Sequence, residues 1–129
     1  AAWPLVIAAL NRAGLGPLRA EVSGPALRRS GLRGMDQVCA RLGGGADYVI
    51  FGHTHRAGPL AGDDPAEWVS AHGSRLINSG CWVHEPAFVG PDASQSPYRT
   101  GFCVVVEDTD PPTPPRLLNL LDPDPPHPA

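Results

Sequence analysis

Apolar residues along the chain fall into two helix-like stretches, followed by several short strand-like runs. The run from Trp3 to Gly14 is apolar on almost every side and predicts a helix that needs a neighbour to bury it. A second helix is predicted from Leu27 or Ser30 to Leu42, where three consecutive glycines stop it. The residues predicted to share its apolar face, at helical spacing, are Met35, Val38, Cys39 and Leu42.

A short apolar strand is predicted directly after this glycine break. Tyr48–Phe51 is a run of consecutive apolar residues, as expected for a strand buried on both faces. Helix, glycine break and strand together are typical of one step of a layered α/β fold. Further strands are predicted within residues 74–80, 81–85, 101–107 and 115–121, with loops over residues 58–74 and 86–98. The last two strands are expected to form a hairpin with a proline-rich connection.

Length and composition limit the possible classes of protein. The 129 residues fit one domain over residues 1–121, followed by a Pro/Asp-rich tail over residues 122–129 that we expect to be disordered. A net charge of −3 without a basic cluster argues against a nucleic-acid-binding surface. The N-terminal apolar run is too short for a membrane span, which needs roughly 20 residues. Three cysteines form no even disulfide framework, which favours a reduced, cytoplasmic protein.

Two histidines follow the predicted strand and are the main candidates for chemistry. His53 and His55 stand at its C-terminal end, where open α/β sheets place their ligand sites. Residues two apart in an extended or tight segment point to the same side, so both imidazoles can approach one small volume. Gly52 is expected to let the backbone turn sharply. Imidazole is a common ligand of divalent transition metals, but a catalytic zinc usually takes three protein ligands.

The combination of Gly52-His53-Thr54-His55 with Asn78-Ser79-Gly80 resembles the C-terminal half of the calcineurin-like metallophosphoesterases. In that family a Val/Ile-rich strand ends in Gly-His-Xaa-His, and a later strand carries Asn-Xaa-Gly. The resemblance covers roughly residues 32–121. It implies an α/β (α+β) fold, namely the C-terminal part of a four-layer αββα sandwich.

The resemblance also implies a dinuclear metal centre that hydrolyses phosphomonoesters or phosphodiesters. His53 would ligate one metal ion and His55 the other, with Mn, Fe or Zn as divalent or mixed-valence candidates. Arg56 would either contact the phosphate of the substrate or be a solvated side chain. Gly52, Asn78 and Gly80 would give structural support, and we expect Asn78 to fix a turn.

The chain departs from the family pattern before residue 52. The family's Asp-Xaa-His, Gly-Asp-Xaa-Xaa-Asp and Gly-Asn-His-Asp/Glu motifs are absent, and residues 1–52 contain no histidine. No catalytic residue is therefore assigned, and the chain alone is expected to be inactive. The missing N-terminal half of the domain is the expected partner. The alternative is a non-catalytic binding or scaffold module that retains this part of the sandwich.

Other candidate residues have simpler interpretations. His72 and His84 flank the predicted strand over residues 74–80, and we interpret both as surface histidines. Cys81 is expected to pack in a core, since no third group is evident that would orient a Cys/His pair. Trp68 and Trp82 are interpreted as core or loop anchors.

Overall fold

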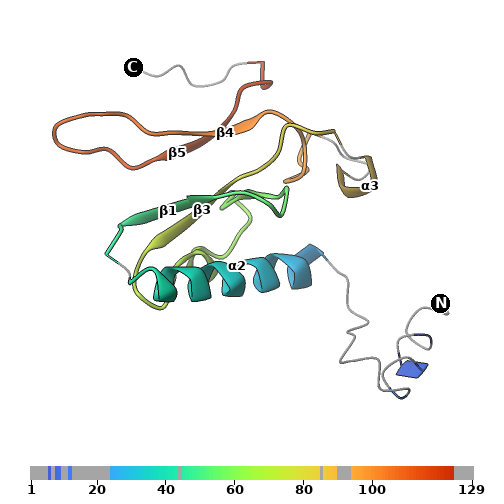
Figure 1. Ribbon diagram of the computed structural model, residues 1–129. Coiled ribbons are helices and arrows are strands. Elements are labelled where there is room, and N and C mark those ends of the chain that lie inside the picture. Colours follow the sequence, from blue (N-terminus) through green and yellow to red (C-terminus); the bar gives the residue numbers. More distant parts are fainter. Residues whose placement is uncertain are drawn as a thin grey trace.

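The computed structural model describes residues 6, 8, 9, 12, 24–43, 45–84, 86–89 and 94–123. The described part of the chain is mixed α/β, with one long helix and two small sheets stacked in three layers (Figure 1). The helix, α2, lies against one face of the first sheet, and the hairpin of the second sheet lies over the other face. The elements are α2 (Gly24–Arg41), β1 (Tyr48–Phe51), β2 (Ala57–Gly58), η1 (Pro65–Trp68), β3 (Arg75–Ser79), α3 (Pro86–Val89), β4 (Phe102–Val105) and β5 (Arg116–Asn119). The predicted helix over residues 3–14 lies almost entirely outside the described residues.

Helix α2 begins at Gly24, earlier than predicted, and ends at Arg41. Its buried side chains are Leu32 and Cys39, and they pack with Trp68 and Leu76 in the core between helix and sheet. Met35 adds to this core, as predicted. The predicted positions of Val38 and Leu42 in the apolar face are wrong, because 41% of Val38 and 80% of Leu42 are exposed. The face of α2 that contains residues 32, 35 and 39 is therefore the face that packs on the sheet.

The first sheet has the order β1-β3-β2. β1 runs parallel to β3, with Phe51 opposite Asn78, and β2 runs antiparallel to β3 on its other side. Val49 and Phe51 pack against the helix-side core. β1 is thus an edge strand within the described part of the chain, and Ile50 is 43% exposed. The prediction that this strand is buried on both faces is therefore wrong here: Val49 and Phe51 face the helix, and Ile50, on the opposite face, is left partly uncovered.

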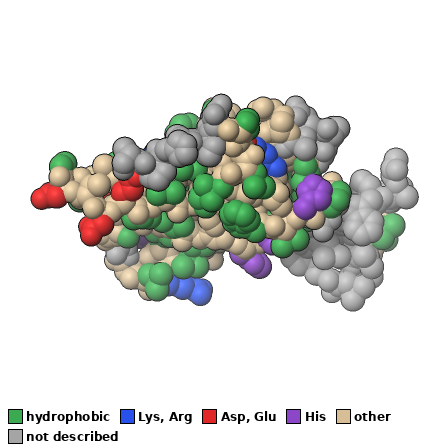
Figure 2. Space-filling view, turned by 90° about the horizontal axis from the view of Figure 1, so that it is seen from above, with side chains coloured by type: hydrophobic (Ala, Val, Ile, Leu, Met, Phe, Trp, Pro, Cys, Tyr) green, Lys and Arg blue, Asp and Glu red, His purple; other side chains and the backbone are tan. Residues whose placement is uncertain are grey.

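The second sheet is the predicted hairpin. β4 pairs antiparallel with β5, and Phe102 lies opposite Asn119. Side chains alternate across a strand, so Cys103, Val105 and Leu118 share one face, while buried Phe102 belongs to the other. Apolar side chains are visible on the upper surface of the molecule (Figure 2). No described helix covers the outer face of this hairpin.

Several loop and strand predictions need correction. Residues 81–84 form bends and not a strand, because Gly80 has a φ of +73° and turns the chain away from β3. Cys81 is only half-buried, and its thiol donates to the carbonyl of Val83 instead of packing in a core. Trp68 is 3% exposed, as a core anchor should be, whereas Trp82 is 60% exposed. The short elements β2, η1 and α3 lie in or at the edge of segments predicted as loops.

Asp122, the first residue of the predicted tail, has a partner in the described part of the chain. Asp122 forms an ion pair with Arg99, whose Nη2 lies 2.9 Å from Oδ2 of the carboxylate. The remainder of the predicted tail, residues 124–129, lies outside the described residues. Among the helices of the described part of the chain, none combines the length and the apolar character that a membrane span needs.

Candidate metal-ligand loop

The two histidines lie in a loop, residues 52–56, that crosses over the end of β3. The loop leaves β1 on one side of β3 and enters β2 on the other side. It therefore spans two strand spacings, roughly 9–10 Å, above the C-terminal end of the central strand. The backbone of Ala57 is fixed where the loop ends, because its N–H donates to the carbonyl of Pro97 at 2.8 Å. The topology thus places both histidines at the carboxyl edge of the parallel strand pair.

Both histidines have a left-handed backbone conformation. The φ angle is +80° at His53 and +60° at His55, and both side chains are exposed. An L-residue in this region costs roughly 1–2 kcal/mol relative to the right-handed one, and glycine avoids that cost. The expected source of the sharp turn, Gly52, is not in the left-handed region, and a Cβ there would make only ordinary contact with Ser79 Oγ at 3.7 Å. The turn is made by the histidines themselves.

Asn78 and Gly80 hold this loop on the end of β3. Asn78 is 2% exposed, and its side-chain amide donates to Thr54 Oγ1 at 2.6 Å. Its Oδ1 accepts the backbone N–H of Gly80 at 3.0 Å, which forms the turn after β3. At Gly80 a Cβ would lie 3.1 Å from the Cβ of Ala57, so the strand end and β2 are in close contact. Both polar atoms of the Asn78 side chain therefore make hydrogen bonds within the chain.

Arg56 is buried, so the alternative of a solvated side chain is wrong, whereas its contact with a substrate phosphate stays a prediction. It is 9% exposed, and it makes a two-point ion pair with Asp63, Nη1–Oδ2 at 3.0 Å and Nη2–Oδ1 at 2.6 Å. Nη1 also donates to the carbonyl of Ala57, and the guanidinium lies 5.6 Å from the ring centroid of Trp68. Its end nitrogens are thus committed within the protein. We conclude that Arg56 fixes the exit of the histidine loop and is not a solvated side chain.

Asp63 is the charged partner of this arrangement, and its carboxylate is almost fully buried. Burial alone would raise the pKa of Asp63, but hydrogen bonds from Arg56 and the Leu60 backbone outweigh it. Together with the positive charges of Arg56 and Arg28, they hold the pKa below its ordinary value. Asp63 therefore stays ionised at neutral pH and stabilises the charged form of its partners.

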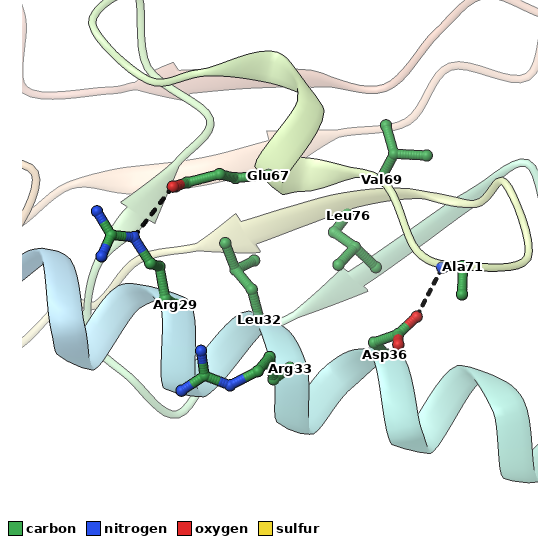
Figure 3. A pocket seen from close by; sticks show the side chains of 8 residues that line it. All are labelled: Arg29, Leu32, Arg33, Asp36, Glu67, Val69, Ala71 and Leu76. Atoms are coloured by element: carbon green, nitrogen blue, oxygen red, sulfur yellow. Dashed lines mark hydrogen bonds and ion pairs between the residues drawn. The ribbon is translucent and has the colours of Figure 1, made fainter.

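A second set of ion pairs fastens helix α2 to this region. Glu67 accepts from Arg28 at 2.7 Å and from Arg29 at 3.2 Å, and the hydrogen bond from Arg28 is the main reason that the pKa of Glu67 is lowered. Figure 3 shows the hollow beside these pairs, between α2 and the turn before β3, with Leu32 and Leu76 in it. Asp36 closes its other end by accepting the Ala71 N–H at 2.7 Å. The polar groups here join helix and turn to each other.

A cleft of about 320 Å³ lies on the side of His53. It is bounded by the first turns of α2, by the histidine loop and by Phe88 and Tyr98. His53 and Thr54 line it, whereas His55 does not. Phe88 and Tyr98 form its far wall, with their rings stacked at a centroid distance of 5.7 Å. A ligand held beside His53 would therefore meet this cleft.

The described residues do not by themselves form a metal centre. Among them, no group of three or more His, Cys, Asp or Glu side chains is close enough to hold a metal ion. His53 and His55 are exposed imidazoles, which suits ligands whose remaining partners come from elsewhere. Neither His72 nor His84 joins them in such a group, and both are exposed. The Arg56–Asp63 ion pair could not be predicted from the sequence. Asp63 lies in a predicted loop, and no sequence pattern there distinguishes a buried aspartate from an exposed one.

Comparison of the chain with protein-family models, with curated proteins and with solved structures finds no match.

Proposed function

We propose that this chain is part of a metal-dependent phosphoesterase, in which His53 and His55 are the metal ligands that it contributes. The substrate would be a phosphomonoester or phosphodiester. A dinuclear centre of Mn, Fe or Zn would offset negative charge on the phosphoryl oxygens during hydrolysis. The protein's own part in this region is to hold two imidazoles at fixed positions on the edge of a sheet.

The conformation of the two histidines carries the proposal. Left-handed histidines at φ +80° and +60° are held on either side of Thr54, which is anchored by a buried asparagine. Strained backbone persists only where surrounding structure enforces it, and it is concentrated at functional sites. Glycine at these two positions would let the loop cross β3 without the steric cost of a left-handed L-residue. We therefore infer that the imidazole side chains are the reason for histidine at both positions. Their exposure leaves both rings accessible to a metal ion.

The open surfaces of the fold support the proposal that a further half of the domain completes it. β1 is an edge strand within the described residues, and Ile50 on its face away from the helix is 43% exposed, although sheets with parallel strands are usually covered on both faces. The outer face of β4 and β5 carries Cys103, Val105 and Leu118 without a described helix over it. Additional strands beside β1 and a helix layer over the hairpin would give the four-layer αββα sandwich. We place this parent protein in the cytoplasm, in keeping with three free thiols in the chain.

Metal binding by the full chain tests the proposal directly. We expect Mn²⁺ or Zn²⁺ to bind weakly by titration calorimetry, because only two ligands are present. His53→Ala and His55→Ala should each reduce this binding by at least fivefold. His72→Ala removes an exposed histidine in another turn and should have no effect. Binding that is unchanged in both loop variants would contradict the proposal.

Turnover and gene context separate the enzyme from a scaffold module. The 129 residues alone should show no metal-dependent hydrolysis of a chromogenic phosphodiester, because the carboxylate and Asn ligands are absent. Measurable turnover that His55→Ala abolishes would overturn that expectation.

In the gene, an in-frame segment encoding Asp-Xaa-His, Gly-Asp-Xaa-Xaa-Asp and Gly-Asn-His before the codon for Ala1 would support the phosphoesterase. A start codon close by with no such segment in or near the gene would favour the non-catalytic module.

A further inference from the structure

The cleft beside His53 has a composition that selects a particular kind of ligand. Its volume of about 320 Å³ exceeds the roughly 150 Å³ that suffices for a benzene molecule in an apolar cavity. Leu27 from α2 forms one wall, and the stacked Phe88 and Tyr98 form the other. The first turns of α2 and the short helix α3 lie at the same end of the molecule (Figure 1). The cleft therefore has an aliphatic and two aromatic side chains in its lining, beside a proposed metal ligand.

The two guanidiniums that line the cleft are ion-paired with carboxylates that lie outside it. Arg28 and Arg56 both line the cleft, but Arg28 is paired with Glu67 and Arg56 with Asp63. Both guanidiniums are held by these carboxylates, although Glu67 also pairs with Arg29, so three arginines share two carboxylates. A ligand anion would have to compete with Asp63 and Glu67 for the arginine N–H groups. The cleft therefore offers no free cation for an anionic group, and a second phosphate or a carboxylate would gain little there. An uncharged group fits this balance.

The aromatic pair favours a planar ring over an aliphatic group of the same size. Phe88 is 52% exposed although it stacks on Tyr98, so part of its ring remains open to a ligand. Aromatic rings prefer offset-stacked or edge-to-face contacts, which add to the gain from burying apolar area. Ser30 adds a hydroxyl at the cleft for a heteroatom on such a ring.

We propose that this cleft binds an uncharged aromatic group, and that this group is the alcohol part of the phosphoester whose phosphate lies at the histidines. The assignment of this group to a phosphoester rests on the proposed function, whereas the binding of an uncharged aromatic group in the cleft does not. The ring would lie between Leu27 and Phe88, with its ester oxygen directed toward His53. The substrate class is then an aryl or arylalkyl phosphoester.

Binding of two uncharged alcohols to the full chain tests the cleft without any metal. Benzyl alcohol and cyclohexylmethanol have nearly the same size but differ in aromaticity. In ¹H–¹⁵N NMR titrations, benzyl alcohol should shift the backbone amides of Leu27, Phe88 and Tyr98. Its dissociation constant should be at least threefold lower than that of cyclohexylmethanol. Equal dissociation constants, no binding, or shifts confined to another surface would overturn the proposal.

A pair of matched variants ties the preference to the cleft. Phe88→Leu keeps an apolar side chain at a half-exposed position and should abolish the threefold preference for benzyl alcohol. Trp82→Leu removes a similarly exposed aromatic side chain that does not line the cleft, and should retain the preference. Retention in Phe88→Leu, or loss in Trp82→Leu, would contradict the assignment.

A second pair of ligands distinguishes this proposal from the proposed function. With Mn²⁺ present, phenylphosphonate should bind at least threefold more tightly than methylphosphonate, and His53→Ala should weaken both. If benzyl alcohol binds in the cleft but neither phosphonate responds to Mn²⁺, the aromatic cleft stands and its link to a phosphoester falls with the proposed function. If both phosphonates bind equally and depend on Mn²⁺, the metal site stands and the assignment of the cleft to the alcohol part of its substrate is wrong.

Discussion

Asn78 donates a hydrogen bond to the hydroxyl of Thr54 at 2.6 Å, which joins the residue between the two histidines to the buried end of β3. The contact links residues far apart in the chain, and it is accompanied by the bond from Gly80 N–H to Asn78 Oδ1. One buried side chain therefore fixes both the loop that carries the imidazoles and the turn beneath it. The positions of His53 and His55 depend on this asparagine.

Removal of the Thr54 hydroxyl should destabilise the chain and loosen the loop. In Thr54→Val the side chain keeps its shape, but the Asn78 amide loses its acceptor. Such a loss costs about 1–3 kcal/mol of unfolding free energy, measurable by urea denaturation. Thr54→Ser retains the hydroxyl and should lose less than half as much. Equal stability of Thr54→Val and the native chain would show that water replaces the hydroxyl without cost.

Replacement of the histidines by glycine should separate stability from metal binding. At φ +80° and +60° glycine has no steric penalty, so His53→Gly and His55→Gly should each be about 1 kcal/mol more stable than the alanine variant at the same position. Both kinds of variant should lose metal binding equally. Thermal unfolding and metal titration on the four variants check this. Alanine variants as stable as the glycine variants would argue against strain at these positions.

The two glycines that flank the site should respond differently to alanine. Gly80 has a φ of +73° and a Cβ there would lie 3.0 Å from Phe102 Cβ, so Gly80→Ala should cost about 2–3 kcal/mol of unfolding free energy. Gly52→Ala meets only Ser79 Oγ at 3.7 Å and should change stability by less than about 0.5 kcal/mol. Urea denaturation of the two variants under identical conditions compares them. A Gly52→Ala variant as unstable as Gly80→Ala would show that Gly52 has a conformational role.

Stability should fall in acid, and part of that fall should come from Asp63. Its pKa in the folded chain lies below its ordinary value, so its contribution is fully present above that ordinary value. The contribution is lost as the pH falls through the lowered folded pKa. At pH 7, Asp63→Asn should cost about 3 kcal/mol, because Arg56 is left buried without its partner. The difference between this variant and the native chain should shrink when unfolding is measured from pH 5 down to pH 2.

The control for this experiment is the more exposed ion pair at the end of the folded body. The hydrogen bond from Arg99 lowers the pKa of Asp122 as well, but this carboxylate is 38% exposed. Exposed pairs contribute little, because water and salt screen them. Asp122→Asn should therefore leave the acid-dependent loss of stability nearly unchanged. A larger effect at Asp122 than at Asp63 would contradict the assignment of the acid sensitivity to the buried pair.

The sequence predicted the elements whose patterns are local. The hairpin of β4 and β5 and the strand Tyr48–Phe51 follow from short apolar runs between turn residues. α2 follows from helical spacing, although the orientation of its face was misjudged at Val38 and Leu42. Helical spacing indicates which residues lie on one face of α2. Which of those residues become buried depends on where the sheet contacts that face. The two-residue strand β2 has no pattern of its own, since it is defined only by its pairing with β3.

The candidate site was predicted by its residue types but not by its geometry. The position of His53 and His55 after a strand follows from the sequence, whereas their left-handed backbone does not. That conformation results from the loop crossing β3, which depends on strand order and not on neighbours in the sequence. The role of Arg56 was missed for a similar reason, because its partner Asp63 becomes buried only when helix α2 and the loop meet.

The parallel pairing of β1 with β3 also determines when the histidine loop can form. All of residues 52–74 lie in the connection between these two strands, so the loop is closed only when Arg75–Ser79 docks beside Tyr48–Phe51. Contacts between residues distant in the chain form late, because the chain loses entropy when the connection closes, before the stabilising contacts have formed. The imidazoles therefore reach their positions in the same cooperative step that completes the sheet, and hydrogen exchange at β1 and at the loop should report one common opening.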